Sequence, residues 1–384
     1  MNNFEYYRPT RILFGKGMIS QLSSLLDKAQ KILLLYGGGS VKKNGVYEQV
    51  AKALEGYNYS EFGGIEPNPE YETCMKAVEL VKRENIEFIL AVGGGSTLDA
   101  AKFIAAAAKY EGKDPYDIIT EEYEVKDALP VGDVITLPAT GSEMNGNSVI
   151  SRASTGRKAA FVSEKVYPEF SIIDPQTTFS LPVRQTVNGI VDTFVHTMEQ
   201  YCTYDVNTPL QDEWMLGLLR TLIQEGPKAL AKPEDYDARA NIFWCATCGL
   251  NHFMSLGCVQ DWATHQIGHE LTAFYGLDHG QSLAIILPRL LQNQKLSKSE
   301  KLAKLARNVF GVEESVDLKA AGVAIYKIEE FFNFIGMKTH LADYGIDAGE
   351  AAEQARKALA MRNVKLGEKG AVTADTAFEI IRNS

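Results

Sequence analysis

Hydrophobic runs that end in glycine punctuate the first half of the chain. Residues 31–36 (Lys-Ile-Leu-Leu-Leu-Tyr) and 87–92 (Glu-Phe-Ile-Leu-Ala-Val) both run into Gly-Gly-Gly-Ser, at 37–40 and 93–96. Helical patterns follow near residues 47–54 and 97–109, and a third strand-like run covers 133–138. Strands without polar positions that alternate with helices predict a parallel sheet covered on both faces.

The pattern changes near residue 180. From Arg184 onward the chain has long stretches of helical periodicity and no comparable strand-like runs. The stretches cover residues 184–203, 210–230, 235–256, 260–275, 281–293, 297–308 and 316–335. We therefore predict two domains, an α/β domain over residues 1–180 and an all-helical domain over residues 181–384.

Charge and cysteine content exclude several classes of function. The 384 residues carry 49 acidic and 39 basic side chains, a net charge of −10, whereas proteins that coat nucleic acid or anionic membranes present a basic face. There are only five cysteines, an odd number, which favours a reducing compartment and a fold without a disulfide framework. The N-terminal residues lack the apolar segment of a signal peptide, and no apolar run approaches the roughly 18 residues of a membrane helix. We expect a cytoplasmic protein without nucleic-acid or membrane partners.

The two Gly-Gly-Gly-Ser turns are candidates for phosphate binding. A strand, a glycine turn and a helix bring bare backbone N–H groups and the positive end of a helix dipole to the carboxyl edge of a parallel sheet. The candidate residues are Gly37, Gly38, Gly39, Ser40, Gly94, Gly95 and Ser96. Each turn alone is equally explained as a tight strand-to-helix connection. Two such turns, with Thr140-Gly141-Ser142 after the third run, favour a dinucleotide across several strand ends.

Preference between NAD and NADP depends on the residues beside the adenosine ribose, where a carboxylate binds the free 2′-hydroxyl and repels a 2′-phosphate. Residues 36–43 (Tyr-Gly-Gly-Gly-Ser-Val-Lys-Lys) contain no carboxylate and two lysines. This composition favours NADP, although Lys42 and Lys43 are almost as well explained as a solvated approach to a helix.

An aspartate and several histidines of the second half have the spacing of metal ligands. Asp192 and His196 are four residues apart, and so are His265 and His269, so that each pair lies on one face of a helix. His279 follows in a loop-like break. One carboxylate and three imidazoles, from Asp192, His196, His265 and His279, suit Fe²⁺ or Zn²⁺ with a position left for water or substrate.

Other reactive side chains have simpler explanations. His252 and His340 are treated as ordinary core or surface residues, and that explanation stays open for each metal candidate taken singly. Cys245 and Cys248 form a C-x-x-C pair, but their apolar helical surroundings and the lack of a second pair favour buried structural thiols.

Several longer segments resemble the iron-containing (group III) alcohol dehydrogenases, and among them the butanol dehydrogenase and broad-range aldehyde reductase branch. The resemblance covers essentially the whole chain. It rests on residues 8–17, 36–45, 62–69, 91–99, 136–143, 188–200 and 260–288. One departure from the family pattern lies in residues 257–270, where Gln260, Asp261 and Trp262 stand ahead of the metal-binding histidine in place of the usual residues.

The resemblance implies an architecture and a set of functional residues. The fold would be dehydroquinate synthase-like, with a dinucleotide-binding α/β domain, a helical metal-binding domain and the active site between them. The metal ligands of the family correspond to Asp192, His196, His265 and His279. Its cofactor-binding positions correspond to residues 37–40 and 94–96 together with Asp99, Thr136, Thr140, Ser142 and Lys158.

The activity implied by the resemblance is metal-dependent, NAD(P)-linked hydride transfer between small to medium primary alcohols and their aldehydes. His279 would act in the catalytic centre as a metal ligand, and His269 is the candidate proton relay. The resemblance also implies a homodimer, with residues 11–14 as a contact strand. Two alternatives stay open: a dehydroquinate synthase-like lyase that retains NAD, and a non-catalytic metal- or nucleotide-binding protein.

Overall fold

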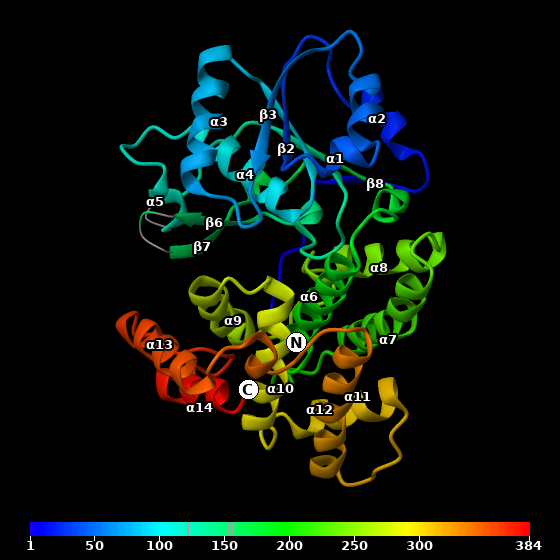
Figure 1. Cartoon of the computed structure of the whole chain (residues 1–384), viewed down its shortest axis with the longest axis vertical. Coiled ribbons are helices and arrows are strands. Elements are labelled where there is room, and N and C mark those ends of the chain that lie inside the picture. The colour runs from blue at the N-terminus through cyan, green and yellow to red at the C-terminus, as the bar shows by residue number, and fades with distance from the viewer. Residues whose placement is uncertain (121–122, 153, 155–156) are drawn as a thin grey trace. The chain divides into compact units, whose positions relative to one another are not determined.

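The computed structural model describes residues 1–120, 123–152, 154 and 157–384, and the apolar runs of the first half form a six-stranded parallel sheet (Figure 1). The strand order is β1-β8-β5-β4-β2-β3, and each neighbouring pair is parallel. The bounds are Arg11–Phe14 for β1, Lys31–Gly37 for β2, Asn58–Ile65 for β3, Phe88–Gly93 for β4, Val131–Ile135 for β5 and Phe170–Ile173 for β8. The predicted parallel sheet is confirmed.

Apolar side chains cover both faces of the sheet because successive residues of a strand point to opposite sides. Leu33 and Leu35 of β2 belong to one core cluster, together with residues of α3 and α4. Ile32 and Leu34 belong to another, together with residues of α2. This double burial explains the lack of polar positions in β4 and in residues 32–36 of β2. The helix bounds are Val46–Ala53 for α2, Tyr71–Glu84 for α3 and Gly95–Ala108 for α4.

The order of the strands reverses between β2 and β4. After β2 the chain passes through α1 (Ser40–Lys43) and α2 to the outer strand β3, whereas after β4 it passes through α4 to β5 on the opposite side. In open α/β sheets, ligands bind at the carboxyl ends of the strands where such a reversal occurs. Both Gly-Gly-Gly-Ser turns follow these two strands, so the topology brings them to one edge of the sheet.

Three further elements belong to the same unit as the sheet. An antiparallel hairpin is formed by β6 (Asn147–Arg152) and β7 (Arg157–Val162), and α5 spans Tyr116–Ile119. The helix α8 (Tyr236–Gly249) comes from the second half of the chain, and it ends earlier than the predicted stretch 235–256. The hairpin and β8 are absent from the sequence prediction, and the predicted strand at 133–138 is displaced toward the N-terminus.

The chain divides into two units that are not continuous in sequence. The sheet unit comprises Tyr7–Pro182 and Pro233–Asn251. The helical unit comprises Met1–Tyr6, Val183–Lys232 and His252–Ser384. A single boundary near residue 180 would assign Pro233–Asn251 to the helices, whereas its packing assigns it to the sheet. The combination of an α/β unit with an all-helical unit confirms the predicted fold class.

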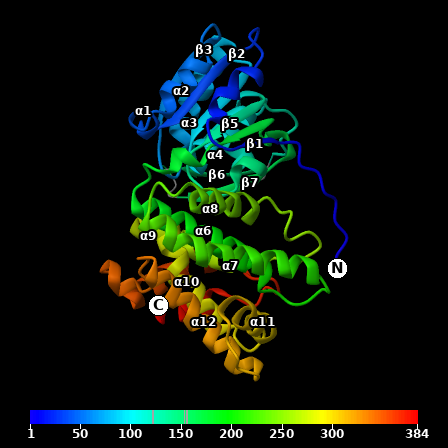
Figure 2. The ribbon, with the colours of Figure 1, turned by 90° about the vertical axis from the view of Figure 1, so that its right-hand side faces the viewer.

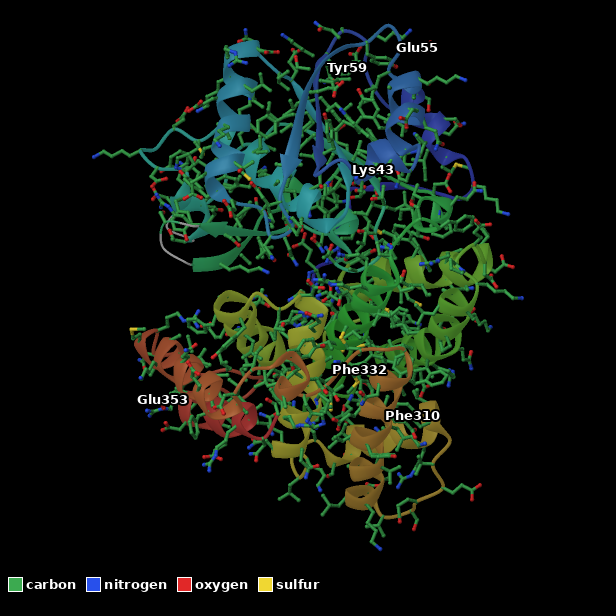
Figure 3. All side chains as sticks on the ribbon, viewed as in Figure 1. Lys43, Glu55, Tyr59, Phe310, Phe332 and Glu353 are labelled. Carbon is green, nitrogen blue, oxygen red and sulfur yellow. The ribbon has the colours of Figure 1, made fainter. Side chains whose placement is uncertain are left out.

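Eight of the α-helices that the structure describes belong to the helical unit, and Figure 2 shows several of them from the side. They are α6 (Val183–Tyr201), α7 (Pro209–Ala231), α9 (Ala263–Tyr275), α10 (His279–Asn293), α11 (Ser299–Phe310), α12 (Asp317–Phe334), α13 (Ala348–Met361) and α14 (Ala374–Arg382), with a short 3-10 turn at Leu341–Tyr344. Phe332, labelled in Figure 3, is fully buried, and its ring centroid lies 5.3 Å from that of Phe194. The helices α13 and α14 lie outside the predicted stretches. Within the described part of the chain, no helix combines the length and apolarity that a membrane span needs.

Candidate functional site

Four predicted ligands converge in the helical unit. Asp192 and His196 lie one turn apart on α6, His265 lies on α9, and His279 is the first residue of α10. One ligand atom from each lies within 4.8 Å of the others. The Nε2 atoms of His196, His265 and His279 lie 3.6, 3.7 and 3.4 Å from Asp192 Oδ1. Such a set is able to hold one metal ion.

The donor set fits a divalent cation. Asp192 is 3% exposed, and among the described residues neither its Oδ1 nor His265 Nε2 forms a hydrogen bond. Burial opposes ionisation of Asp192, yet the neighbouring imidazoles hold its pKa below the usual range. Burial also opposes protonation of His265, but the carboxylates of Glu199 and Asp192 raise its pKa to about 9. Buried acceptors that form no hydrogen bond, in a field that favours positive charge, suit Fe²⁺ or Zn²⁺.

His279 reaches the cluster because the start of α10 is fixed against α6. Asp278 caps α10 in a capping box with Gln281, whose side chain accepts a hydrogen bond from the Asp278 amide at 2.8 Å. The side-chain amide of Asn188 on α6 donates to Asp278 at 2.7 Å. A Cβ on Gly280 would lie 2.9 Å from the Cα of Asn188, so the two helices meet closely at this point.

His269 lies beside the four-ligand set and is not part of it. It follows His265 by one turn of α9, and its ring centroid lies 5.4 Å from that of His279 and 6.3 Å from that of His265. Its side chain is partly exposed. The predicted neighbourhood of His269 and the metal candidates is therefore present.

Glu199 is a neighbour of the cluster that the sequence prediction lacks. It lies on α6, three residues after His196, and its carboxylate contacts Nδ1 of His265. The sequence offers one signal for it, because a spacing of three residues places Glu199 and His196 on neighbouring positions of one helix.

The two glycine turns differ in how much space a side chain would have at the glycine positions. A Cβ on Gly95 would lie 2.4 Å from Thr140 Oγ1, and one on Gly93 would lie 2.5 Å from Thr97 Oγ1. A Cβ on Gly38 or Gly39 would meet nothing within 4 Å. The turn after β4 therefore needs glycine for its own packing, whereas the turn after β2 leaves open space on its surface.

Asp99, Thr136, Thr140 and Ser142 gather around the turn after β4. The amide of Thr136 donates to Gly93 O at 2.9 Å, and the amide of Ser142 donates to Thr140 Oγ1 at 3.3 Å. The hydroxyl of Ser142 donates to Asp99 at 3.0 Å. Asp99 and Ser142 therefore support the turn from behind with their side chains.

Lys102, which the sequence prediction lacks, anchors residues 142–147, the segment that Ser142 begins. It is fully buried on α4, and its ammonium group donates to Ser142 O at 2.7 Å and to the backbone oxygens of Asn145 and Asn147 at 2.8 and 2.9 Å. Burial lowers the pKa of Lys102 to about 8, although three neighbouring carboxylates oppose the shift. Burial likewise raises the pKa of Asp99 to about 6.

Lys158 and Ser96 both contact Asn68, a residue that the sequence prediction lacks. Lys158 Nζ donates to the side-chain oxygen of Asn68 at 2.7 Å, and the amide of Asn68 lies 3.4 Å from Ser96 Oγ. Asn68 belongs to the segment 62–69 that carries part of the family resemblance. Asn68 therefore links these two predicted positions.

A carboxylate does lie near residues 36–43, contrary to what that stretch alone indicates. Glu61 on the neighbouring strand β3 lies 3.5 Å from Lys42 Nζ and accepts a hydrogen bond from Tyr36 at 3.0 Å. Lys42 also lies over the rings of Tyr36 and Tyr47. The sequence did not indicate this pair, because α1 and α2 separate β2 from β3 in the chain. Lys43, labelled in Figure 3, is exposed at the end of α1.

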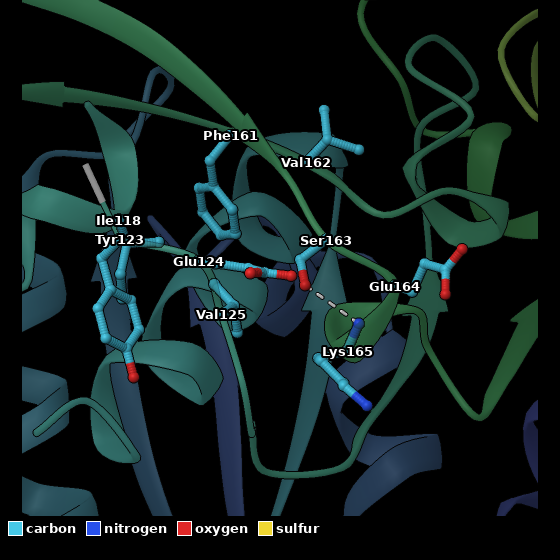
Figure 4. Close-up of a pocket in the computed structure, with 9 residues that line it drawn as sticks. All are labelled: Ile118, Tyr123, Glu124, Val125, Phe161, Val162, Ser163, Glu164 and Lys165. Carbon is cyan, nitrogen blue, oxygen red and sulfur yellow. Dashed lines mark hydrogen bonds between the residues drawn. The ribbon is translucent and has the colours of Figure 1, made fainter. Parts of the chain in front are cut away.

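A cavity of about 410 Å³ lies elsewhere in the sheet unit (Figure 4). It lies against α5 and the end of β7, and its lining includes Tyr123, Glu124 and Phe161. None of the predicted site residues lines it. We therefore assign it no part in the candidate site.

Comparison with known families covers nearly the whole chain. Residues 9–175 match the family model described as iron-containing alcohol dehydrogenase. Residues 186–384 match the model described as Fe-containing alcohol dehydrogenase family, C-terminal.

Individual relatives match along their full length. The chain is 50% identical to the NADPH-dependent aldehyde reductase YqhD of Escherichia coli over 382 residues, and this alignment covers 99% of each chain. It is 37% identical over 393 residues to NADH-dependent butanol dehydrogenase B of Clostridium acetobutylicum, which covers 100% of each. Among solved structures, NADH-dependent butanol dehydrogenase A of Thermotoga maritima superposes with a TM-score of 0.93 at 36% identity, over 100% of this chain and 98% of the other.

Proposed function

Because the chain belongs to the iron-containing alcohol dehydrogenase family, we propose that it is an NAD(P)-dependent alcohol dehydrogenase and aldehyde reductase for small to medium primary alcohols and aldehydes. The observation that carries the proposal is the convergence of one carboxylate and three imidazoles within 4.8 Å in a chain that also has two glycine turns at the switch point of a parallel sheet. A hydride-transfer enzyme of this class needs both kinds of site.

Asp192, His196, His265 and His279 would hold the metal, Fe²⁺ or Zn²⁺. When bound, such an ion supplies a Lewis acid that polarises the carbonyl oxygen of an aldehyde. The chain holds the donors in place: α6 presents Asp192 and His196 on one face, and the cap at Asp278 fixes His279. Asp192, His196 and His265 are buried, whereas His279 is partly exposed.

Residues 94–96 would hold the diphosphate of the cofactor and residues 37–40 its adenosine end, and the bound cofactor supplies the hydride. The start of α4 offers free backbone N–H groups, and Gly95 removes a side chain that would collide with Thr140. Asp99 and Ser142 hold the adjoining turn, while Lys158 and Thr136 adjoin it. We propose NADPH as the preferred cofactor, since Lys42 and Lys43 flank the first turn and the 50% identical relative is named as NADPH-dependent.

His269 is our candidate for moving a proton. Its imidazole lies beside His279, is partly exposed, and remains outside the four-ligand set. An imidazole titrates near neutral pH and can pass a proton between bound substrate and water. We also propose a cytoplasmic homodimer, in which the edge strand β1 (Arg11–Phe14) contributes to the contact.

A screen of two- to six-carbon aldehydes tests the proposed function. Purified protein is assayed with NADPH and with NADH, before and after treatment with a chelator and after return of Fe²⁺ or Zn²⁺. We expect steady oxidation of NADPH that disappears with the chelator and returns with the metal. Absence of turnover with every aldehyde, together with tightly retained NAD, would indicate a lyase of dehydroquinate synthase type instead.

A further inference from the structure

We propose that Glu199 is a positioning residue of the metal site: it orients the ring of His265 and anchors the start of the helix that carries it. The proposal rests on the metal site of the proposed function. Glu199 lies on α6 and is 3% exposed, and it is not one of the four converging ligands. Its role would be to hold a ligand that comes from another helix.

The carboxylate of Glu199 replaces a missing helix cap. The residue before α9, Trp262, has a left-handed backbone with φ of 64° and makes no side-chain capping hydrogen bond. Glu199 Oε1 instead accepts hydrogen bonds from the amides of Thr264 at 2.6 Å and His265 at 3.3 Å. A negative charge at this end of a helix is favoured by the helix dipole as well as by the free N–H groups. The backbone that carries His265 is thereby tied to α6.

The second oxygen of the same carboxylate fixes the ring. Glu199 Oε2 contacts Nδ1 of His265, and because a carboxylate only accepts hydrogen bonds, Nδ1 keeps its proton and a metal ion would replace the proton on Nε2. That Nε2 atom is buried, lies 3.7 Å from Asp192 Oδ1 and forms no hydrogen bond with any described residue. A carboxylate on the far nitrogen of a ligating histidine orients the ring and makes it a stronger donor.

Glu199 also balances the charge of the site. Asp192 and Glu199 are each 3% exposed, and together they supply two negative charges to a region where a divalent cation would bring two positive ones. A buried cation with incomplete compensation is costly. With Glu199 replaced by a neutral residue, the site would keep one uncompensated positive charge.

The local fold does not depend on the Glu199 side chain alone. The backbone oxygen of Glu199 accepts from the amide of Asp261 at 2.9 Å, and Asp261 accepts from the amide of Ala263 at 2.9 Å and pairs with Lys298 at 2.9 Å. Lys298 pairs in turn with Glu368 at 2.9 Å. These contacts remain in a Glu199 variant, so we expect the turn before α9 to form without the carboxylate.

Metal affinity of Glu199→Gln and Glu199→Ala tests the proposal. The metal-free proteins are titrated with Zn²⁺ and Co²⁺ in competition with a chelator of known affinity, and their unfolding temperatures are recorded with and without metal. We expect the dissociation constant to rise about 10- to 100-fold. We also expect the absorption bands of bound Co²⁺ to shift, because the ring of His265 is no longer oriented.

Glu270→Gln is the matched control. Glu270 lies on α9, the helix that carries His265, is 8% exposed, pairs with Arg362 and is not one of the four converging ligands. This variant loses a buried carboxylate of α9, and we expect unchanged metal affinity. Equal loss of affinity in the Glu270 and Glu199 variants would overturn the proposal, since it would show a general weakening of the helix.

Three further results separate the two proposals. If Glu199→Gln binds metal as tightly as the unaltered protein, the role of Glu199 is overturned even when aldehydes are reduced. If the unaltered protein binds no metal, the proposed function is overturned as well. Should the variants fail to fold, ¹⁵N spectra of the histidine rings in the unaltered zinc-loaded protein decide: a ligating histidine protonated on Nδ1 supports the proposal, and coordination of His265 through Nδ1 overturns it.

Discussion

Asp192 of the helical unit is buried and Asp99 of the sheet unit is half-buried, and their pKa values move in opposite directions. Three imidazole nitrogens face Asp192, and they hold its pKa low in spite of burial. Asp99 has Lys102 nearby, but burial still raises its pKa to about 6. Asp192 is thus held as an anion that can bind a cation, whereas Asp99 serves as an acceptor that shapes a turn.

The same contrast holds for the two candidate sites as wholes. The metal cluster is made of side chains from three helices, each fixed by a neighbour such as Asp278 or Glu199. The proposed nucleotide turns offer mainly backbone, and side chains beside them, such as Ser142 and Lys102, form hydrogen bonds within the protein. Substitutions should therefore act on the metal cluster through lost donors and on the turns through added bulk.

Replacing Asp192 gives the largest expected effect. In Asp192→Ala three imidazoles would have to hold a divalent cation without an anionic ligand, so metal affinity should fall by more than about a hundredfold, beyond the loss typical for an outer partner. Aldehyde reduction should be lost with it. Elemental analysis of the purified protein and turnover measure this, and cofactor binding in the sheet unit is the internal control. A variant with full metal content and full turnover would remove Asp192 from the ligand set.

Replacing Asp99 changes how stability depends on pH. The folded-state pKa of about 6 exceeds the ordinary value of 3.8, so the native state binds more protons than the unfolded state between these values. Stability contributed by this group is therefore present below about pH 4 and is lost as the pH rises to about 6, by at most about 3 kcal/mol. Urea unfolding across this range should show a shallower decline for Asp99→Asn. Identical slopes for both proteins would contradict the raised pKa.

Side chains added to the glycine turns should distinguish two reasons for glycine: packing within the protein and close approach of the cofactor. Gly95→Val places a Cβ 2.4 Å from Thr140 Oγ1, so we expect a loss of about 1–3 kcal/mol of stability together with weaker cofactor binding. Gly38→Ala meets nothing within 4 Å and should leave stability unchanged while weakening cofactor binding. Thermal unfolding and cofactor titration by nicotinamide fluorescence measure both. Unchanged cofactor affinity in Gly38→Ala would place the adenosine end of the cofactor away from this turn.

The pair of Lys42 and Glu61 should give the smallest effect. Glu61→Gln removes the carboxylate that now neutralises Lys42, so a 2′-phosphate should be favoured, by roughly two- to fivefold in the ratio of kcat/KM for NADPH to that for NADH. Raised salt should reduce the change. An unaltered ratio would show that this pair lies outside the reach of the adenosine ribose.

Periodicity predicts the elements that bury one continuous face, and it fails where tertiary contacts decide. The runs that became β2 and β4 and the pair of Asp192 and His196 follow from local spacing alone. The strand β8 has four residues, one of them the buried Ser171, and offers too short a pattern. Glu199 looks like any polar residue of a helix until α9 brings His265 against it. Glu61 likewise meets Lys42 only through the pairing of β2 with β3.

The position of α8 in the sequence affects when the sheet unit can finish folding during synthesis on the ribosome. Gly141 lies against the backbone of Ala246 and Thr247, and Thr247 donates a hydrogen bond to the buried Glu143 at 2.5 Å. The loop beside the nucleotide turns therefore acquires its last partner only after about 250 residues have been synthesised, once the first helices of the other unit have already emerged. Neither unit corresponds to a continuous fragment. A fragment that ends at residue 180 would therefore have a sheet that lacks its contacts with α8. We expect recombination between relatives to keep residues 7–251 together.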